Sequence, residues 1–359
     1  MKVVVVGAGY AGTFAANRVA KKVKGAEVTV VNVRPEFVER VRLHQQIAGT
    51  AAAATPLTSM LRDGITSRVG TAAKIGDGTV TLDDGGTLDF DHLFLAVGST
   101  VRPLVGTVPV GTWEGAEQAR AALAVLPAGS AVTVVGGGPT GIETATEVAE
   151  ARPDVQVRLV GSSVAGSFSG GARQRVLAAL DRLKVEVIVD GVEEVAVGDG
   201  EFDGVVRLRS GADVASDLTL WAIVAGVPEL AARSGLVVDA EGRVVVDEFL
   251  RSVTDERIFA VGDCAAVPGA RFGCQTAGAQ AGAAADALAA SLIEGRRPQP
   301  YSLRYVARCV SLGRKDAVAQ FTHHDDTLRE RYIKGRAAVV AKGITVSGAK
   351  FGSRKAVGA

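Results

Sequence analysis

Residues 1–20, MKVVVVGAGYAGTFAANRVA, decide how the rest of the chain is organised. Residues 3–6 are four valines, as expected of a short strand that is buried on both faces. Gly7, Gly9 and Gly12 follow in the spacing GxGxxG and lead into a helix of small residues. Strand, glycines and helix in this order are typical of a dinucleotide site, whose pyrophosphate lies against free N–H groups at the helix start.

The same pattern returns in the middle of the chain. Residues 131–135 form a second apolar strand, and Gly136, Gly138 and Gly141 repeat the GxGxxG spacing before another helix. One such motif is weak evidence in a chain with 44 glycines. Two motifs, each followed by a further apolar strand, are far harder to obtain by chance, so we predict two dinucleotide sites.

Neither site has an acidic residue where one is usual. A carboxylate at the end of the second strand normally binds a ribose hydroxyl. The strand at residues 27–31 ends instead at Asn32, and the strand at 155–160 ends at Gly161. Asn32 can bond a ribose through its amide or can simply end the strand, and Arg34 is near enough in sequence to reach a phosphate or adenine.

The missing carboxylate at the second site bears on cofactor choice. Without it, nothing at the strand end repels a 2′-phosphate. Ser162, Ser163 and either Arg173 or Arg175 could meet that phosphate. We therefore predict that NADPH is used at least as well as NADH.

Two further segments are candidates for cofactor contacts. Residues 40–49, RVRLHQQIAG, are predicted to be a helix, in which Arg42 either contacts a cofactor or belongs to a solvated face. Residues 257–263, RIFAVGD, are predicted to be a buried strand that ends in Gly262 and Asp263. Asp263 either accepts hydrogen bonds from a ribityl hydroxyl or caps the helix that follows.

Composition narrows the function classes. A formal net charge of +1 over 359 residues gives no overall attraction to nucleic acid. No apolar run reaches the roughly 18 residues of a membrane-spanning helix, and a core strand at residue 3 leaves no room for a signal peptide. The three cysteines form no CxxC pair, and residues 323–326 (HHDD) suit a solvated turn better than a metal site. We expect a cytoplasmic protein without a metal.

The order of GAGYAG, LAVGS, GGGPTG with Glu143, and IFAVGD resembles the flavoproteins with two dinucleotide-binding domains in the pyridine nucleotide–disulfide oxidoreductase superfamily. Within it, the chain is most similar to type II NADH:quinone oxidoreductases and to apoptosis-inducing-factor-like (ferroptosis-suppressor-like) oxidoreductases. The resemblance implies an α/β fold with two Rossmann-like domains. An FAD domain (1–105 and 241–297) would hold an inserted NAD(P)H domain (106–240), followed by a small C-terminal α+β region (298–359).

The resemblance also implies which residues contact the cofactors. Those at FAD would be Gly7, Gly9, Tyr10, Ala11, Gly12, Asn32, Arg34, Arg42, Ala96, Gly98, Ser99, Gly262, Asp263, Gln275, Thr276 and Ala277. Those at the nicotinamide cofactor would be Gly136, Gly138, Pro139, Thr140, Gly141, Glu143, Ser162, Gly226 and Val227. Glu143 and Gln275 are the candidates nearest the reacting rings, and no single acid–base residue is predicted to be catalytic.

The function implied is hydride transfer from NAD(P)H to FAD, with the electrons passed on to a quinone or similar aromatic acceptor. Disulfide reductases of this superfamily carry a CxxC pair that corresponds to residues 40–49, where this chain has no cysteine, so we expect no redox disulfide. Two alternatives stay open: a ferredoxin-type reductase and a redox-sensing interaction protein. We expect weak or absent membrane association because glycines interrupt the tail at 336–359, and a homodimer is left open.

Overall fold

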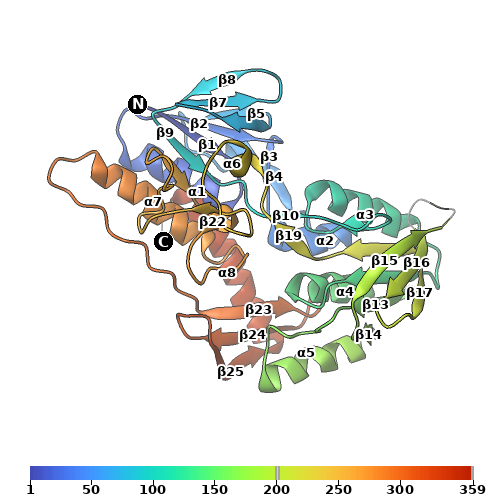
Figure 1. Cartoon of the computed structure of the whole chain (residues 1–359). Helices are drawn as coiled ribbons and strands as arrows, with labels where there is room; N and C mark the ends of the chain where they lie inside the picture. The colour runs from blue at the N-terminus through green and yellow to red at the C-terminus, as the bar shows by residue number, and fades with distance from the viewer. Residues whose placement is uncertain (199, 201–202, 357–359) are drawn as a thin grey trace.

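Two parallel sheets, each carrying one glycine motif, form the framework, and a small antiparallel sheet lies beside them (Figure 1). The computed structural model describes residues 1–198, 200 and 203–356. The predicted α/β class, with two Rossmann-like domains and a C-terminal α+β region, is confirmed.

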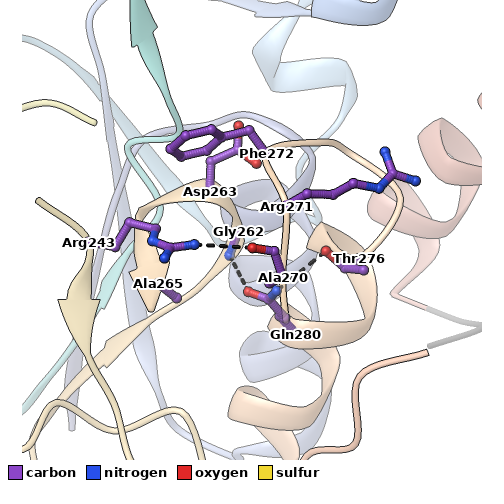
Figure 2. A pocket seen from close by; sticks show the side chains of 9 residues that line it. All are labelled: Arg243, Gly262, Asp263, Ala265, Ala270, Arg271, Phe272, Thr276 and Gln280. Carbon is purple, nitrogen blue, oxygen red and sulfur yellow. Dashed lines mark hydrogen bonds between the residues drawn. The ribbon is translucent and has the colours of Figure 1, made fainter. Parts of the chain in front are cut away.

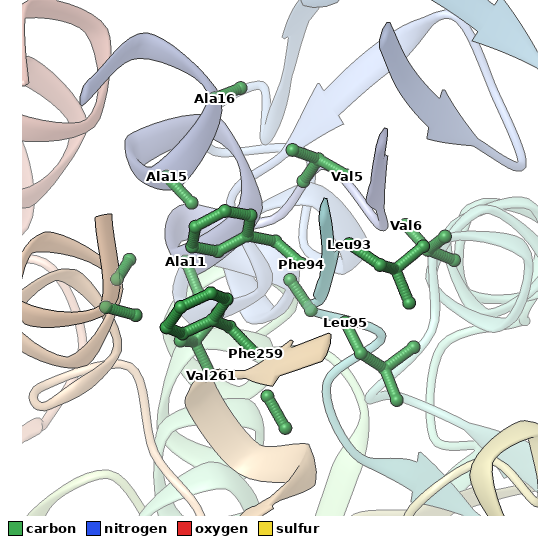
Figure 3. Packing of buried hydrophobic residues seen from close by; sticks show 14 of the residues in the cluster. Val5, Val6, Ala11, Ala15, Ala16, Leu93, Phe94, Leu95, Phe259 and Val261 are labelled. Carbon is green, nitrogen blue, oxygen red and sulfur yellow. The ribbon is translucent and has the colours of Figure 1, made fainter. Parts of the chain in front are cut away.

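The first parallel sheet joins the two ends of the predicted FAD domain. Its strand order is β21-β9-β1-β2-β5. Strand β21 pairs in parallel with β9, so a segment near residue 258 completes a sheet that starts at residue 2. Figure 3 shows Phe94 stacked on Phe259 across this junction, with ring centroids 5.0 Å apart. The strands are β1 (Lys2–Val6), β2 (Glu27–Asn32), β5 (Thr66–Val69), β9 (His92–Leu95) and β21 (Ile258–Ala260), and helices α1 (Tyr10–Lys22) and α7 (Ala277–Ser291) pack on each other beside them.

The second parallel sheet repeats this arrangement around the second glycine motif, in the order β11-β18-β12-β13-β14. Its strands are β11 (Val108–Pro109), β12 (Ala131–Val135), β13 (Gln156–Val160), β14 (Glu186–Ile188) and β18 (Leu218–Trp221). Its helices are α3 (Trp113–Val125), α4 (Pro139–Ala151) and α5 (Gly170–Arg182).

Short strands and helices surround the two parallel sheets and connect them. Two three-stranded antiparallel sheets consist of β6 (Ala72–Ile75), β7 (Thr79–Leu82) and β8 (Thr87–Asp89), and of β15 (Val192–Val197), β16 (Gly204–Leu208) and β17 (Asp213–Ser216). Between the two sheets run β10 (Thr100–Val101) and β19 (Val224–Gly226), which pair with each other. The other short strands and α-helices are β3 (Glu36–Val38), β4 (Ala54–Pro56), α2 (Leu43–Ile47), α6 (Leu230–Arg233), β20 (Val244–Val245) and β22 (Ala265–Ala266), and 3₁₀ turns occur at Arg40–Arg42, Leu57–Ser59 and Gly262–Cys264.

The C-terminal region differs from the prediction. Its antiparallel sheet consists of β23 (Ala307–Ser311), β24 (Ala317–Thr322) and β25 (Leu328–Lys334). The tail was expected to be broken by glycines, which is wrong: α8 (Gly335–Lys355) is one continuous helix that runs from this sheet back to α1 (Figure 1). The last three residues of the tail lie outside the described part.

Helix α8 also removes one reason given for weak membrane association. Val340, Ile344 and Phe351 are exposed on it, so the tail has an apolar surface that the sequence interpretation did not include. Within the described residues, no helix combines the length and apolar character needed to cross a membrane.

Candidate functional site

The first glycine loop has the shape that a pyrophosphate needs. Gly7 has a positive φ of 95°, and a Cβ on Gly12 would collide with the carbonyl oxygen of Gly7, so both positions require glycine. A Cβ on Gly9, in contrast, would meet no atom within 4 Å. Helix α1 starts here without a side-chain cap and without an acidic residue in its first turn. An open, uncapped helix start fits an anionic phosphate.

The second glycine loop repeats the first. Gly136 has a φ of 130°, and a Cβ on Gly141 would collide with the carbonyl oxygen of Gly136. Gly138 again faces open space, and α4 starts at Pro139 without a side-chain cap. Because the two loops share this geometry, both fit the pyrophosphate of a dinucleotide.

Asp263 lies at the carboxyl end of β21, where the first sheet faces the loop of residues 96–99. Its carboxylate accepts hydrogen bonds from the Ser99 hydroxyl at 2.7 Å and from the Gly273 N–H at 2.8 Å. Arg40 donates to the carbonyl oxygen of Ser99 at 2.9 Å and so fixes this loop. Gly98, with a φ of 70°, makes the turn. A carboxylate held here can accept hydrogen bonds from the hydroxyls of a ligand that crosses the strand ends.

A narrow crevice beside Asp263 is lined in part by Thr276 and Gln280 at the start of α7 (Figure 2). Gly262 donates its N–H to the Gln280 side chain at 2.7 Å, and Gln280 in turn lies 3.4 Å from the Thr276 hydroxyl. Thr276 precedes the helix and Ala277 is its first residue, both of them buried. The start of α7 is therefore locked against the end of β21.

Asn32 and Arg34 are held by protein groups. The Asn32 amide accepts from Ala8 N at 3.1 Å and donates to the carbonyl oxygens of Arg34 at 2.7 Å and Glu36 at 3.2 Å. Arg34 pairs with Glu114 of α3. Asn32 therefore braces the glycine loop, and its contact with a ribose stays a prediction.

Residues 40–49 differ from the single helix that was predicted. They form a 3₁₀ turn at Arg40–Arg42 and the short helix α2, and His44 and Gln45 are buried. The centre of this segment is therefore not a solvated face, while the Arg42 side chain is 26% exposed and its contact with a cofactor stays a prediction. Arg42 donates to buried Glu39 at 3.2 Å.

Glu39 links this segment to the first glycine loop. It also receives the Tyr10 hydroxyl at 3.3 Å and the Lys350 ammonium at 2.8 Å. Tyr10, Arg42 and α8 thus all contact one buried carboxylate. Because the Tyr10 side chain is buried and lies next to Glu39, the pKa of its hydroxyl is raised.

Glu143 gathers groups from three distant parts of the chain. Its Oε1 accepts from the backbone N–H of Ser311 at 2.9 Å and from the Lys342 ammonium, and its Oε2 lies 3.7 Å from His44 Nδ1. Lys342 also donates to the Ser311 hydroxyl at 2.7 Å. Nothing in the local sequence relates Lys342 to Glu143, and sequence reasoning missed Lys342, Ser311 and Arg40.

Burial and charge set the protonation of this group. Burial alone would raise the pKa of Glu143, but Lys342, His44 and the Ser311 N–H together hold it below its ordinary value. Burial lowers the pKa of His44 to about 4 against the attraction of Glu143. At neutral pH the cluster is thus a carboxylate paired with an ammonium, beside a neutral imidazole.

A cavity of about 120 Å³ opens over this cluster. Its walls come from three segments: the 3₁₀ turn and α2, with Arg42 and Gln45; the end of β23 and the loop after it, with Ser311 and Arg314; and α8, with Lys342. Lys342 connects the cavity to α4 through Glu143, and Arg42 connects it to α1 through Glu39 and Tyr10. The cavity is therefore linked by hydrogen bonds to both helices that start at the glycine loops.

The HHDD segment is a turn, but it is not merely solvated. Asp326 has a φ of 70°, and its carboxylate receives Arg271 at 2.7 Å and Arg308 at 2.7 Å. Gln275 lies with its amide within 3.3 Å of the backbone of residues 306 and 307, and its contact with the flavin stays a prediction. Among the described residues, no three His, Cys, Asp or Glu side chains are grouped to hold a metal. All three cysteines are free thiols.

The other predicted positions lie around the two loops. Ala96 is buried at the end of β9, and a Cβ on Gly7 would approach its backbone carbonyl. Gly226 pairs with Thr100 between the two sheets, and Val227 follows it into the first core. Ala11 is buried behind the first loop, Thr140 is exposed at the start of α4, and Ser162 is exposed just after β13.

Comparisons with known proteins agree with this geometry. Residues 1–287 match the family described as pyridine nucleotide-disulphide oxidoreductase. The chain is 29% identical over 337 residues to ferroptosis suppressor protein 1 of Taeniopygia guttata, covering 89% of this chain and 88% of that protein. It is 33% identical over 299 residues to an NADH dehydrogenase-like protein of Mycobacterium tuberculosis, covering 74% and 73%.

Among solved structures, the sulfide:quinone oxidoreductase of Aquifex aeolicus superposes with a TM-score of 0.80 at 20% identity, covering 99% of this chain and 92% of that one. That likeness supports the fold. FAD and NAD(P)H are the cofactors of the matched family, and both glycine loops fit them. The chain belongs to the pyridine nucleotide-disulphide oxidoreductase family and is a flavin-dependent oxidoreductase.

Proposed function

We propose that this protein oxidises NAD(P)H and reduces a small aromatic acceptor of the quinone class in the cavity between α2, the loop after β23 and α8. In this proposal Gly7, Gly9 and Gly12 hold the FAD pyrophosphate and Asp263 its ribityl chain. The loop of Gly136, Gly138 and Gly141 holds the nicotinamide cofactor. FAD, when bound, supplies hydride acceptance and electron transfer.

The observation that carries the proposal is the placement of Lys342. Its ammonium is in the cavity wall, bonded to Glu143 of the second glycine helix and to the Ser311 hydroxyl. Reduction of a quinone to a quinol takes up a hydride equivalent and one proton from solvent. Lys342 is charged and carries three N–H donors, so it can bind the acceptor's carbonyl oxygen and give it that proton.

Glu143 and His44 support this role. The Glu143 carboxylate holds the Lys342 ammonium in place through an ion pair, and neutral His44 lies against the other oxygen of Glu143. The walls of the cavity also include the apolar side chains of Val41, Val339 and Val346, which suit an aromatic ring.

The test separates the two half-reactions. Lys342→Gln keeps a hydrogen-bond donor near Glu143 but removes the charge and the transferable proton. We expect quinone turnover to fall about a hundredfold, while anaerobic bleaching of FAD by NADPH in a stopped-flow instrument keeps its wild-type rate. Lys315→Met, at an exposed lysine near the same loop, is the matched control.

The same assays decide between the alternatives. Unchanged quinone turnover in Lys342→Gln would contradict the assigned cavity. Turnover with an iron–sulfur protein and none with quinones would favour the ferredoxin-type reductase. Bleaching by NADPH without turnover on any acceptor would favour the redox-sensing interaction protein.

A further inference from the structure

Glu147 is a buried acid beside the acceptor cavity that the proposed reaction does not use. It lies on α4, one turn after Glu143, and is 1% exposed. Its Oε1 accepts the Thr50 hydroxyl and lies 3.6 Å from Arg314 Nε, whereas its Oε2 has no hydrogen-bond partner among the described residues. A buried carboxylate oxygen without a donor is costly, and protonation lowers that cost because it removes the charge. Burial accordingly raises the pKa of Glu147.

Three glutamates follow one face of α4 from the cavity toward the surface. Glu143, Glu147 and Glu150 are spaced by four and three residues, so neighbouring Cβ atoms lie about 5–6 Å apart on one side of the helix. All three carboxylates contact the end of β23 or the loop after it. Glu150 is partly exposed, and Glu143 holds the Lys342 ammonium. Glu147 is thus the buried member between a carboxylate near solvent and the carboxylate behind Lys342.

Lys342 needs a source of protons on its buried side. In the proposed reaction its ammonium gives one proton to the acceptor's carbonyl oxygen and becomes an amine. An acceptor in the cavity covers Lys342 from that side, and the Lys342 side chain is only 16% exposed before anything binds. Behind it lies the Glu143 carboxylate, whose lone pairs can take up a proton and pass it on.

We propose that Glu147 carries protons from solvent to Lys342 through Glu143. A proton moves from the Glu147 carboxyl to the Glu143 carboxylate and from there to the Lys342 amine, and Glu147 takes a new proton from solvent on the side of Glu150. Side chains one helical turn apart can exchange a proton directly or through one water. Each turnover then moves one proton from solvent to the acceptor, as quinone reduction by a hydride equivalent requires. This inference rests on the proposed function, and Glu147 acts through Lys342 without touching the acceptor.

The charges around Glu147 oppose one another. Arg314 faces it from the loop after β23 and favours its carboxylate, whereas Glu143 and Glu150 on the same helix favour its protonated form. On the side of α2, neutral His44 lies 3.7 Å from Glu143. Because these influences act in opposite directions, Glu147 can both hold a proton and release it, as a proton carrier must.

The activity test compares two acceptors in the Glu147→Gln holoenzyme. Glutamine keeps the size of the side chain and an oxygen for Thr50 but cannot carry a proton. With a quinone, steady-state kcat should fall at least about tenfold at unchanged KM, while ferricyanide, which takes electrons without protons, should be reduced at the wild-type rate. The first reoxidation of reduced enzyme by a quinone should also keep its rate, because Lys342 still holds its proton. Glu147→Asp should keep part of the quinone kcat, and Glu256→Gln, at an exposed glutamate of another segment, should change none of these rates.

Infrared spectroscopy of the holoenzyme gives a readout that needs no acceptor. The C=O band of a protonated carboxyl is distinct from the bands of carboxylates. One such band should be missing in Glu147→Gln, kept in Glu256→Gln, and titrate at a higher pH than the bands of exposed glutamates.

Three results would overturn the inference. A Glu147 band that titrates like an exposed glutamate would show that this group does not retain its proton. Equal losses with ferricyanide and quinone in Glu147→Gln would show a purely structural role. Unchanged quinone turnover in Glu147→Gln, while Lys342→Gln has lost it, would show that protons reach Lys342 by another route. Unchanged quinone turnover in both variants would instead contradict the proposed function, and the relay with it.

Discussion

Gly9 and Gly12 of the first loop are required for different reasons. Gly12 is packed, because a Cβ there would collide with the Gly7 carbonyl, whereas Gly9 faces open space. Gly9→Ala should therefore leave the apoprotein folded, but its methyl group would occupy the place where the backbone approaches the pyrophosphate. We expect Gly9→Ala to weaken FAD binding at least about tenfold with unchanged thermal stability of the apoprotein, and Gly12→Ala to lower both.

Flavin titration of apoprotein and thermal unfolding measure these two effects separately. The second loop offers an internal comparison, since Gly138 is open and Gly141 is packed in the same way. Gly138→Ala should raise KM for the nicotinamide cofactor and leave FAD binding intact. If Gly9→Ala bound FAD like the wild type, the phosphate would not lie over this loop.

Among whole elements, α8 ties the three parts of the chain together. Lys342 reaches Glu143 of α4, and one end of the helix is bound to α1, where Asn17 donates to the carbonyl oxygen of Ser353 at 2.8 Å. Between these contacts, Lys350 donates to buried Glu39 at 2.8 Å and to Thr55 at 2.7 Å. The helix therefore spans from the proposed acceptor cavity to the start of the first glycine helix.

Lys350→Met tests this link. It leaves Glu39 buried with Arg42 and Tyr10 as its remaining partners. Because Lys350 is partly exposed and Glu39 keeps one cation, we expect a loss of about 1–2 kcal/mol, less than for a fully broken buried pair. The holoenzyme should unfold at a lower temperature and release FAD faster. Lys355→Met, at an exposed lysine on the same helix, is the control, and equal effects of the two changes would contradict the link.

The elements also show how far sequence reasoning reaches. Both glycine motifs could be predicted because their spacing encodes backbone geometry within ten residues. Helix α8 could not be predicted, since Gly343, Gly348 and Gly352 each disfavour a helix by about 1 kcal/mol. Contacts distant in sequence, such as the hydrogen bond from Ser353 to the Tyr10 carbonyl, outweigh that preference. Lys342 and Glu143 meet across 199 positions, which no local pattern records.

At the scale of the whole molecule, His44, Glu143 and Lys342 join three regions that the topology keeps apart. His44 follows the first turn of residues 40–42, Glu143 lies on α4 and Lys342 lies on α8. Because the fold lowers the pKa of both His44 and Glu143, a lower pH affects the stability of this junction through these two groups.

The free energy of unfolding should fall as the pH is lowered from about 6.5 toward 4. The unfolded chain protonates His44 near pH 6.5, whereas burial delays this to about pH 4 in the folded chain, so the unfolded state binds more protons between these values. The His44 contribution amounts to about 3 kcal/mol. Glu143, whose pKa is lowered, adds a loss of stability of the same sign, while Glu147, whose pKa is raised by burial, opposes that loss.

Urea unfolding with saturating FAD measures this effect. The free energy of unfolding of His44→Asn should depend less on pH in this range than that of the wild type. A wild-type profile that is flat from pH 6.5 to 4, or one that His44→Asn leaves unchanged, would show that the buried imidazole does not couple this junction to stability.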